Sequence, residues 1–305
     1  MKNITVTSGY KYTDIDALAC SIAYSKLLNL QGVRSGAYLS KLNYSVSKSI
    51  LSWDFSYLPI KSISPTQEVI MVDISDPNYF PKNVDINKVI KVFDHHTGFG
   101  SFWKNKLGIN CKIDFIGSCA TLIFEQWESS VYINQLDSVS ANLLYTAIVS
   151  NTLNFKASIT NNRDIKAFDT LKKYTNLPDN WVENYFGEMQ KPSLVSPKKS
   201  LVNDIKEVII GRKKFVISQL ELWESEKFLL KNKVLIKSLF ADVDKNCYWF
   251  HTSPSIKKGV NYIFTEDIKT QDLLKKILNV SFVNYIAVTQ KLYLRKEIIK
   301  LIQDL

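Results

Sequence analysis

Residues 89–96 read Val-Ile-Lys-Val-Phe-Asp-His-His, an apolar run that ends in three residues able to bind a metal ion. Branched and aromatic residues in a short run favour a buried β-strand, so the polar triplet falls at the strand's carboxyl end. The chain has three His, and two of them stand here beside an Asp. Neighbouring side chains at a strand end point in opposite directions, so His95 and His96 can face different partners. The alternative for either His is a structural hydrogen bond.

Strand-like and helix-like segments alternate through the first half of the chain. Residues 4–7 and 69–73 have strand patterns like the run above, and residues 16–30, 119–126 and 141–150 have helical patterns. This alternation implies βαβ units and a mostly parallel sheet. We therefore predict an α/β fold whose N-terminal domain is a doubly wound parallel sheet. In such sheets ligands bind at the carboxyl ends of the strands.

Acidic residues gather at these predicted strand ends. Asp14 and Asp16 follow the first strand, Asp73 ends the second, and Asp94 ends the third. Capping of a helix explains one Asp of the first pair, but not a second carboxylate so close to it. Like charges at that distance repel unless a cation or a proton lies between them. Four carboxylates around the imidazole of His95 therefore favour two hard or borderline divalent cations.

The basic excess of the chain is mostly lysine. The 305 residues carry a formal net charge of +10, with 35 Lys and only four Arg. A nucleic-acid reader more often clusters Arg with exposed aromatics in one stripe, whereas these Lys are scattered. We expect no nucleic-acid partner, and a small phosphate-containing ligand accounts for whatever part of the charge is functional.

The cysteine spacing and the apolar runs bear on where in the cell the protein is found. The four Cys have no paired spacing, which favours free thiols over a disulfide frame or a zinc site. The first residues lack the apolar stretch of a signal peptide, and no apolar run reaches the roughly 18 residues that span a membrane. We expect a soluble, cytoplasmic protein with no membrane partner.

The composition changes near residues 189–203, where two Pro, three Ser and three Lys interrupt the periodic patterns. Such a stretch suggests a linker. We predict an N-terminal domain at 1–188, a linker at 189–203 and a smaller α/β domain at 204–305, with the active site in the cleft between the domains. Two domains also suit a chain of this length.

The polar elements of the first half occur in one order, Asp14-x-Asp16, Asp73, Asp94-His95-His96 and Gly117-Ser118-Cys119-Ala120-Thr121. In this order they resemble the DHH phosphoesterases. The stretch around Asn151-Thr152 is similar to the next motif of that family, which is usually written with Asp-Thr. The resemblance covers roughly 140 residues and implies metal-dependent cleavage of phosphate bonds.

The second half resembles one branch of that family. Leu294-Arg295-Lys296-Glu297 is similar to the Ser-Arg-Lys-Lys-Gln signature of manganese-dependent, family II inorganic pyrophosphatases. Asp204-Ile205-Lys206-Glu207 is similar to their Asp-x-Lys-Glu segment. Oligonucleotide- and dinucleotide-cleaving relatives carry a Gly-Gly-Gly-His signature, and this chain has no Gly-Gly pair. Exopolyphosphatases share the second domain and remain an alternative.

Three positions depart from the family pattern. Tyr10 stands four residues before Asp14, where the family has a metal-binding His, and a phenol is a poor ligand for divalent cations. Asn151 replaces a metal-binding Asp but keeps a neutral oxygen donor. Glu297 replaces a Lys near the phosphates. These departures weaken metal binding and keep open a catalytically impaired or substrate-shifted relative.

The resemblance implies hydrolysis of inorganic pyrophosphate to two phosphates by a two-metal-activated water. Mn²⁺ is the expected cofactor, with Co²⁺ or Mg²⁺ as alternatives, and a homodimer is expected. The remaining alternatives are a short-chain polyphosphate or nucleotide phosphoesterase, or a phosphate-ligand-binding protein. The implied roles are metal binding for Asp14, Asp16, Asp73, His95 and Asn151; catalysis for His96, Asp73 and Lys206; substrate binding for Lys206, Arg295, Lys296 and His96; and support for Asp94 and Tyr10.

Overall fold

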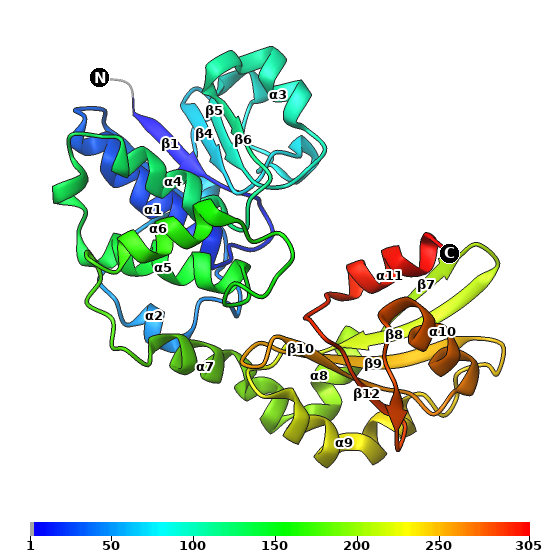
Figure 1. Ribbon diagram of the computed structural model, residues 1–305. Coiled ribbons are helices and arrows are strands. Elements are labelled where there is room, and N and C mark those ends of the chain that lie inside the picture. Colours follow the sequence, from blue (N-terminus) through cyan, green and yellow to red (C-terminus); the bar gives the residue numbers. More distant parts are fainter. Residues whose placement is uncertain (1–2) are drawn as a thin grey trace. The chain divides into compact units, whose positions relative to one another are not determined.

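A computed structural model describes residues 3–305 of the chain (Figure 1). Contacts divide the chain into two compact units, the first formed by Met1–Phe155 with Ile159–Val182 and the second by Lys156–Ser158 with Glu183–Leu305. Each unit is built around one six-stranded sheet. Among the described residues, no helix has both the length and the apolar character needed to cross a membrane.

The sheet of the first unit is entirely parallel. Its strand order is β3-β2-β1-β4-β5-β6, so the order reverses between β1 and β4. This confirms the predicted mostly parallel α/β domain. Polar loops that follow β1 and β4 therefore meet at the reversal point, where open sheets of this kind bind ligands. The strands are β1 (Ile4–Thr7), β2 (Ser35–Leu39), β3 (Leu58–Pro59), β4 (Glu68–Val72), β5 (Val89–Asp94) and β6 (Cys111–Ile113).

Helices cover both faces of this sheet. Val69 and Met71 of β4 pack with Trp103 on one face, and alternation along a strand sends the residues between them to the other face. On that second face Tyr24 contacts Phe93 with ring centroids 4.8 Å apart. The helices of the unit are α1 (Ile15–Leu30), α2 (Lys48–Leu51), α3 (Gly100–Leu107), α4 (Cys119–Glu128), α5 (Ser138–Asn151) and α6 (Asn162–Leu171).

Helix α1 is buried on nearly every side because the sheet, α4 and α5 surround it (Figure 1). Its few polar residues are spread around the helix and are not gathered on one face. Asp14 begins the helix by accepting the backbone N–H of Ala17 at 2.9 Å. The position of α1 therefore holds Asp14 and Asp16 at the end of β1.

The second unit has a mixed sheet in the order β11-β12-β10-β9-β8-β7, in which β8 and β9 are parallel and the other pairs antiparallel. Val216 packs with α8 and α9, whereas its neighbours Phe215 and Ile217 pack with α10 and α11, so helices cover both faces. The elements are α8 (Pro197–Asp204), β7 (Lys206–Ile210), β8 (Lys213–Gln219), α9 (Ser225–Leu239), β9 (Tyr248–Ser255), β10 (Val260–Phe264), α10 (Ile268–Leu278), β11 (Phe282–Val283), β12 (Ile286–Val288) and α11 (Arg295–Gln303).

The segment at 189–203, interpreted as a linker from its composition, is helical almost throughout. It lies within α7 (Trp181–Val195) and α8. Pro197 is at the first position of α8, where its missing N–H leaves no hydrogen bond unmade. The boundary between the two units lies between residues 182 and 183, within α7.

The four cysteines, Cys20, Cys111, Cys119 and Cys247, are free thiols.

Candidate metal centre

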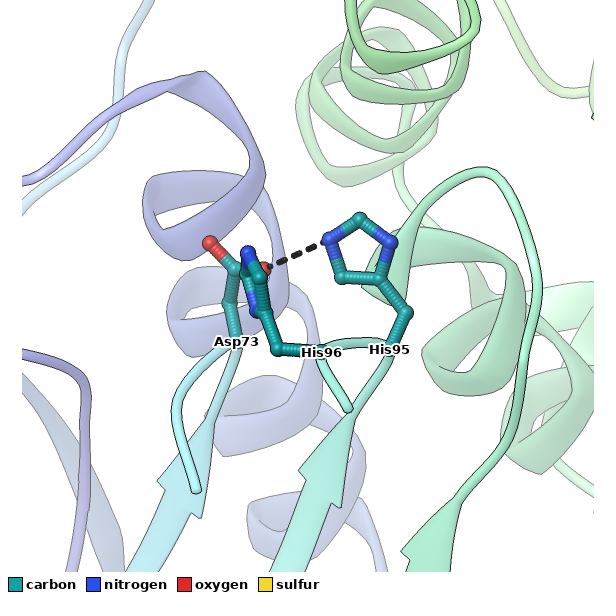
Figure 2. A group of neighbouring side chains, drawn as sticks. All are labelled: Asp73, His95 and His96. Carbon is teal, nitrogen blue, oxygen red and sulfur yellow. Dashed lines mark ion pairs between the residues drawn. The ribbon is translucent and has the colours of Figure 1, made fainter. Parts of the chain in front are cut away.

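The carboxyl ends of β1, β4 and β5 are neighbours in the sheet, and the loops that leave them form one polar cluster. Asp73 follows β4, and His95 and His96 follow β5. One ligand atom from each of these three residues lies within 4.8 Å of the other two (Figure 2). The structure thus brings together side chains that the sequence separates by more than twenty residues.

His95 points its Nε2 atom at two carboxylates. Nε2 lies 3.3 Å from Oδ1 of Asp73 and 3.8 Å from Oδ2 of Asp16. The other nitrogen, Nδ1, lies 3.1 Å from the carbonyl oxygen of Ile116. A carbonyl only accepts, so Nδ1 carries a proton, and in the neutral ring Nε2 presents its lone pair to the carboxylates. Metal-binding histidines are oriented in this way.

Asp73 is buried and backbone-strained. Its φ angle is 57°, in the left-handed region that few residues other than glycine adopt. Its side chain is 6% exposed, and Oδ1 has no hydrogen-bond partner among residues 3–305. Burial raises the pKa of this carboxyl well above its ordinary value, and the charges of Asp16, Asp14 and Asp94 raise it further. A cation beside Oδ1 would remove this cost.

Asp94 is fully buried and organises the two histidines. Its Oδ1 accepts the backbone N–H groups of His95 at 2.8 Å and His96 at 3.2 Å. The same oxygen accepts Nδ1–H of His96 at 2.8 Å. Burial would raise the pKa of Asp94, but the hydrogen bond and charge of His96 outweigh it, so the pKa is lowered. His96 itself is 59% exposed at its side chain.

Asp16 is a fully buried carboxylate that is enclosed by donors from the protein. A carboxylate offers about four lone-pair positions, and five donors occupy this one. Two of the donors are backbone N–H groups at the beginning of α4, where the helix dipole favours a negative charge. The donors are Sγ of Cys20 (3.4 Å) and N of Ala120 (2.8 Å) to Oδ1, and Oγ of Ser118 (3.0 Å), N of Cys119 (2.9 Å) and Nδ2 of Asn151 (2.5 Å) to Oδ2.

These donors do not fully compensate the burial of Asp16. Burial raises the pKa of Asp16, the charge of His95 lowers it, and the charge of Asp14 raises it. Asp14 is half-buried and caps α1 through one oxygen, which leaves its other oxygen free of that role. The two acidic residues of the first loop therefore lie in different environments, one enclosed by the scaffold and one partly open to solvent.

Tyr10 lies on the loop that leaves β1, before Asp14. Its side chain is 42% exposed, and its backbone N–H donates to the carbonyl oxygen of Tyr79 at 3.1 Å. An exposed phenol does not replace an imidazole as a ligand for a divalent cation. Tyr10 is thus held through its backbone, and the residue is partly exposed to solvent.

The first unit matches one protein family. Residues 3–148 match the DHH family, N-terminal domain. We call this matched range the DHH domain. The matched range contains β1, β4, β5 and the three side chains of the candidate metal centre, Asp73, His95 and His96.

The similarity to known proteins extends beyond the DHH domain to most of the chain. A protein of Clostridium acetobutylicum named "Probable manganese-dependent inorganic pyrophosphatase" is 26% identical over 296 residues, which cover 92% of this chain and 90% of that protein. A protein of Bacillus cereus with the same name is 24% identical over 319 residues, with 95% and 94% covered. A crystal structure assigned as a family II inorganic pyrophosphatase of Methanococcus jannaschii shares the fold, with a TM-score of 0.59, 20% identity, and 99% and 98% covered.

The Gly117–Thr121 motif of the DHH domain has a structural role that its resemblance did not reveal. The Gly117 N–H and the Thr121 hydroxyl both donate to Asp164, a fully buried residue in the first turn of α6. A Cβ atom at Gly117 would lie 2.5 Å from Cγ2 of Thr152 and 2.7 Å from Oδ2 of Asp164, so only glycine fits. Sequence reasoning missed Asp164, although Asn161-x-x-Asp164 matches a helix-capping pattern.

The chain turns tightly after α5, just beyond Asn151. Leu153, Asn154 and Phe155 all have φ angles between 48° and 63°. Three such residues in succession are costly for side chains other than glycine. The N–H of Asn154 donates to the carbonyl of Val149 at 2.8 Å, which closes the turn and holds the end of α5. The first unit therefore positions Asn151 at a helix end that is followed by a strained turn.

The predicted phosphate-binding residues lie in the second unit. Lys206 and Lys296 are exposed. Arg295 is largely buried, and its Nη1 and Nη2 atoms bind the two carboxylate oxygens of Asp204 at 2.7 and 3.3 Å. Glu297, which replaces a Lys of the family signature, accepts the backbone N–H of Leu294 at 2.6 Å and so begins α11. Arg295 is therefore paired within its own unit, whereas the two lysines lie exposed at the surface of that unit.

Proposed function

We propose that this protein is a metal-dependent phosphohydrolase that cleaves phosphoanhydride bonds, with inorganic pyrophosphate as the substrate to test first. One observation carries the proposal. A buried oxygen of Asp73 lacks a hydrogen-bond partner among the described residues and lies 3.3 Å from Nε2 of His95. The DHH domain and the pyrophosphatase names of relatives over most of the chain support the same reaction class.

Asp73 and His95 are the residues that would hold the cation. They fit one because they combine an anionic oxygen with an imidazole nitrogen whose orientation Ile116 fixes. A bound divalent cation lowers the pKa of a coordinated water and draws electron density from a phosphate oxygen. Asp94 keeps His96 at the open side of the cluster, where 59% of its side chain is accessible to substrate or solvent.

Lys206 and Lys296 are proposed to bind the phosphate oxygens of the substrate. Both are exposed, which suits transient binding of a small anion. Arg295 holds Asp204, and this carboxylate also accepts the backbone N–H of Gln219. In this state Arg295 ties the beginning of α11 to the end of α8.

A catalytically impaired relative is the second candidate, and a specific contact favours it. Asn151 donates its side-chain N–H to Asp16, whereas the family pattern places a second carboxylate at this position. Tyr10 removes a further ligand. Under this reading the protein binds a phosphate compound without turning it over.

The experiment that separates the two candidates is phosphate release from pyrophosphate, measured after chelator treatment and re-addition of Mn²⁺, Co²⁺ or Mg²⁺. Metal-dependent release that disappears in Asp73→Asn supports the hydrolase, and the variant excludes a contaminating enzyme. Absence of release with all three metals, together with retained pyrophosphate binding, would establish the impaired relative. Triphosphate and short oligonucleotides, assayed in parallel, test the substrate-shifted alternatives.

A further inference from the structure

The two-cation arrangement of the family needs oxygen ligands at positions 16 and 151. In this chain both residues make hydrogen bonds to other protein groups. Such an arrangement requires Asp16 and the residue at 151 to offer lone pairs to one of the cations. In the structure Asp16 already accepts five donors, and Asn151 supplies one of them through its N–H. The Asn151 amide thus directs a proton, not an oxygen lone pair, at the carboxylate of Asp16. Asp16 and Asn151 therefore fit a structural role and do not fit a second metal site.

His96 offers a replacement ligand. Its Nδ1–H donates to Asp94 at 2.8 Å, and Asp94 Oδ1 already accepts two backbone N–H groups, so this oxygen acts as acceptor. The proton is thereby placed on Nδ1, and Nε2 keeps its lone pair. A carboxylate that orients a histidine through the nitrogen opposite the metal is the usual support of a metal-binding imidazole.

The two imidazoles face the same carboxylate. Their ring centroids are 4.5 Å apart with planes at 61°, and Figure 2 shows both rings beside the carboxylate of Asp73. His95, His96 and Asp73 each contribute a ligand atom within 4.8 Å of the others. The unpartnered Oδ1 of Asp73, in a side chain more than nine-tenths buried, supplies an independent sign that a positive group belongs here.

We propose that the centre binds one divalent cation, held by Asp73, His95 and His96, and that Asp16 and Asn151 are not among its ligands. Two imidazoles and one carboxylate leave open positions on the cation for water and for a substrate oxygen. His96 therefore acts as a metal ligand rather than as a contact to the phosphate. The inference rests on the proposed function only in taking a divalent cation as the ligand.

Metal binding without substrate tests this directly. Equilibrium dialysis of the chelator-treated full chain against Mn²⁺ should reach one Mn²⁺ per chain. His96→Asn keeps a donor toward Asp94 but lacks Nε2, and it should weaken Mn²⁺ binding by more than about 100-fold, because even loss of a residue that orients a ligand costs about 10- to 100-fold. Thr97→Ala, at the exposed next residue, is the matched control and should leave the affinity unchanged.

Asn151→Ala supplies a second test, because a residue that does not bind metal can be removed without loss of Mn²⁺ affinity. Anomalous scattering from a crystal soaked in Mn²⁺ should give one peak, in contact with Nε2 of His96. Two equivalents of Mn²⁺, unchanged affinity in His96→Asn, or a weakened affinity in Asn151→Ala would each overturn the single-cation site. Absence of phosphate release while one Mn²⁺ is bound would instead refute the proposed hydrolase and leave this site standing.

Discussion

Asn151 donates its side-chain N–H to Oδ2 of Asp16, so two residues that the sequence suggests as ligands of one cation bind each other. The contact joins positions 135 residues apart and adds to the donors that α4 directs at the same carboxylate. A neutral amide here removes the like-charge repulsion that makes paired carboxylates depend on a metal. The hydrogen bond therefore holds the two residues together without a cation between them.

Asn151→Asp should remove the hydrogen bond to Asp16 and add a carboxylate beside it. The added carboxylate repels Asp16 when metal is absent, so thermal stability falls in the presence of a chelator. Mn²⁺ affinity should rise about tenfold or more, since each added anionic ligand strengthens a divalent site. Titration calorimetry measures the affinity, and Tyr10→His in the same background should raise it further.

The control for this change is Asn87→Asp, which adds the same charge at an exposed position before β5. It should leave Mn²⁺ affinity unaltered. If Asn151→Asp also leaves the titration unaltered, then residue 151 does not face the cation even as a carboxylate.

Asp73→Asn should fold and should lose its response to metal. Asparagine tolerates the left-handed backbone that Asp73 adopts. The raised pKa of Asp73, caused first by burial and then by Asp16, means that its ionised form costs free energy in the folded state at neutral pH. The variant should therefore be more stable than the chelator-treated native protein, as measured by its melting temperature.

Addition of Mn²⁺ at about 100 times its dissociation constant should stabilise the native protein by about 2.7 kcal/mol and leave Asp73→Asn unchanged. A melting temperature of Asp73→Asn that rises with Mn²⁺ as much as that of the native protein would remove Asp73 from the metal centre.

Gly117→Ala should destabilise the DHH domain by about 1–3 kcal/mol, because the new methyl group overlaps Thr152 and Asp164 in a packed interior. Urea denaturation measures the loss. Gly187→Ala is the matched control, since no atom lies within 4 Å of a Cβ at that helical position. It should be neutral or stabilise by up to about 1 kcal/mol. Equal effects of the two substitutions would show that the contact with Asp164 is unimportant.

His251 should make the second unit sensitive to acid. Burial lowers the pKa of His251 to about 3, and its ring nitrogens contact the hydroxyls of Ser218 and Ser253, both at 2.7 Å. A depressed pKa contributes stability that is present above the unfolded value near ~6.5 and is lost as the pH falls toward the folded value. Between pH 7 and pH 5 the loss should be about 2 kcal/mol.

Histidine NMR titration checks this assignment without a variant. The His251 resonance should stay in its neutral position down to pH 4. A midpoint near pH 6 would mean that the ring reaches solvent. His251→Gln should flatten the stability–pH curve between pH 7 and pH 5.

Lys296→Ala should raise the KM for pyrophosphate about tenfold with a smaller change in kcat, if its ammonium group binds a phosphate oxygen equally in ground and transition states. Lys300→Ala, at an exposed position one turn further along α11, is the control and should change neither constant. Similar KM values for both variants would place Lys296 among the solvated surface lysines.

The local sequence predicted the architecture of the DHH domain well. The strand at residues 4–7 and the run at 89–93 lie within one residue of β1 and β5, because short runs rich in β-branched and aromatic residues are typical of strands. The strand β2 was not predicted, since Ser35 to Leu39 contains a Gly and only a short apolar stretch. The helices at 189–203 were missed because their Pro and Ser residues resemble a linker until the packing of Leu201 is known.

The sequence by itself determined which chemistry is available to this protein. The order of Asp73 and Asp94-His95-His96 after apolar runs places metal-binding groups at one edge of a parallel sheet, because strand ends converge there whatever the side-chain details. Only the tertiary structure decided what each group does. Asp16 pairs with Asn151, and Arg295 pairs with Asp204, through contacts between segments 91 to 135 residues apart. The physical reason is that a hydrogen bond depends on atom positions within a few tenths of an ångström, which packing between distant segments sets and local pattern does not.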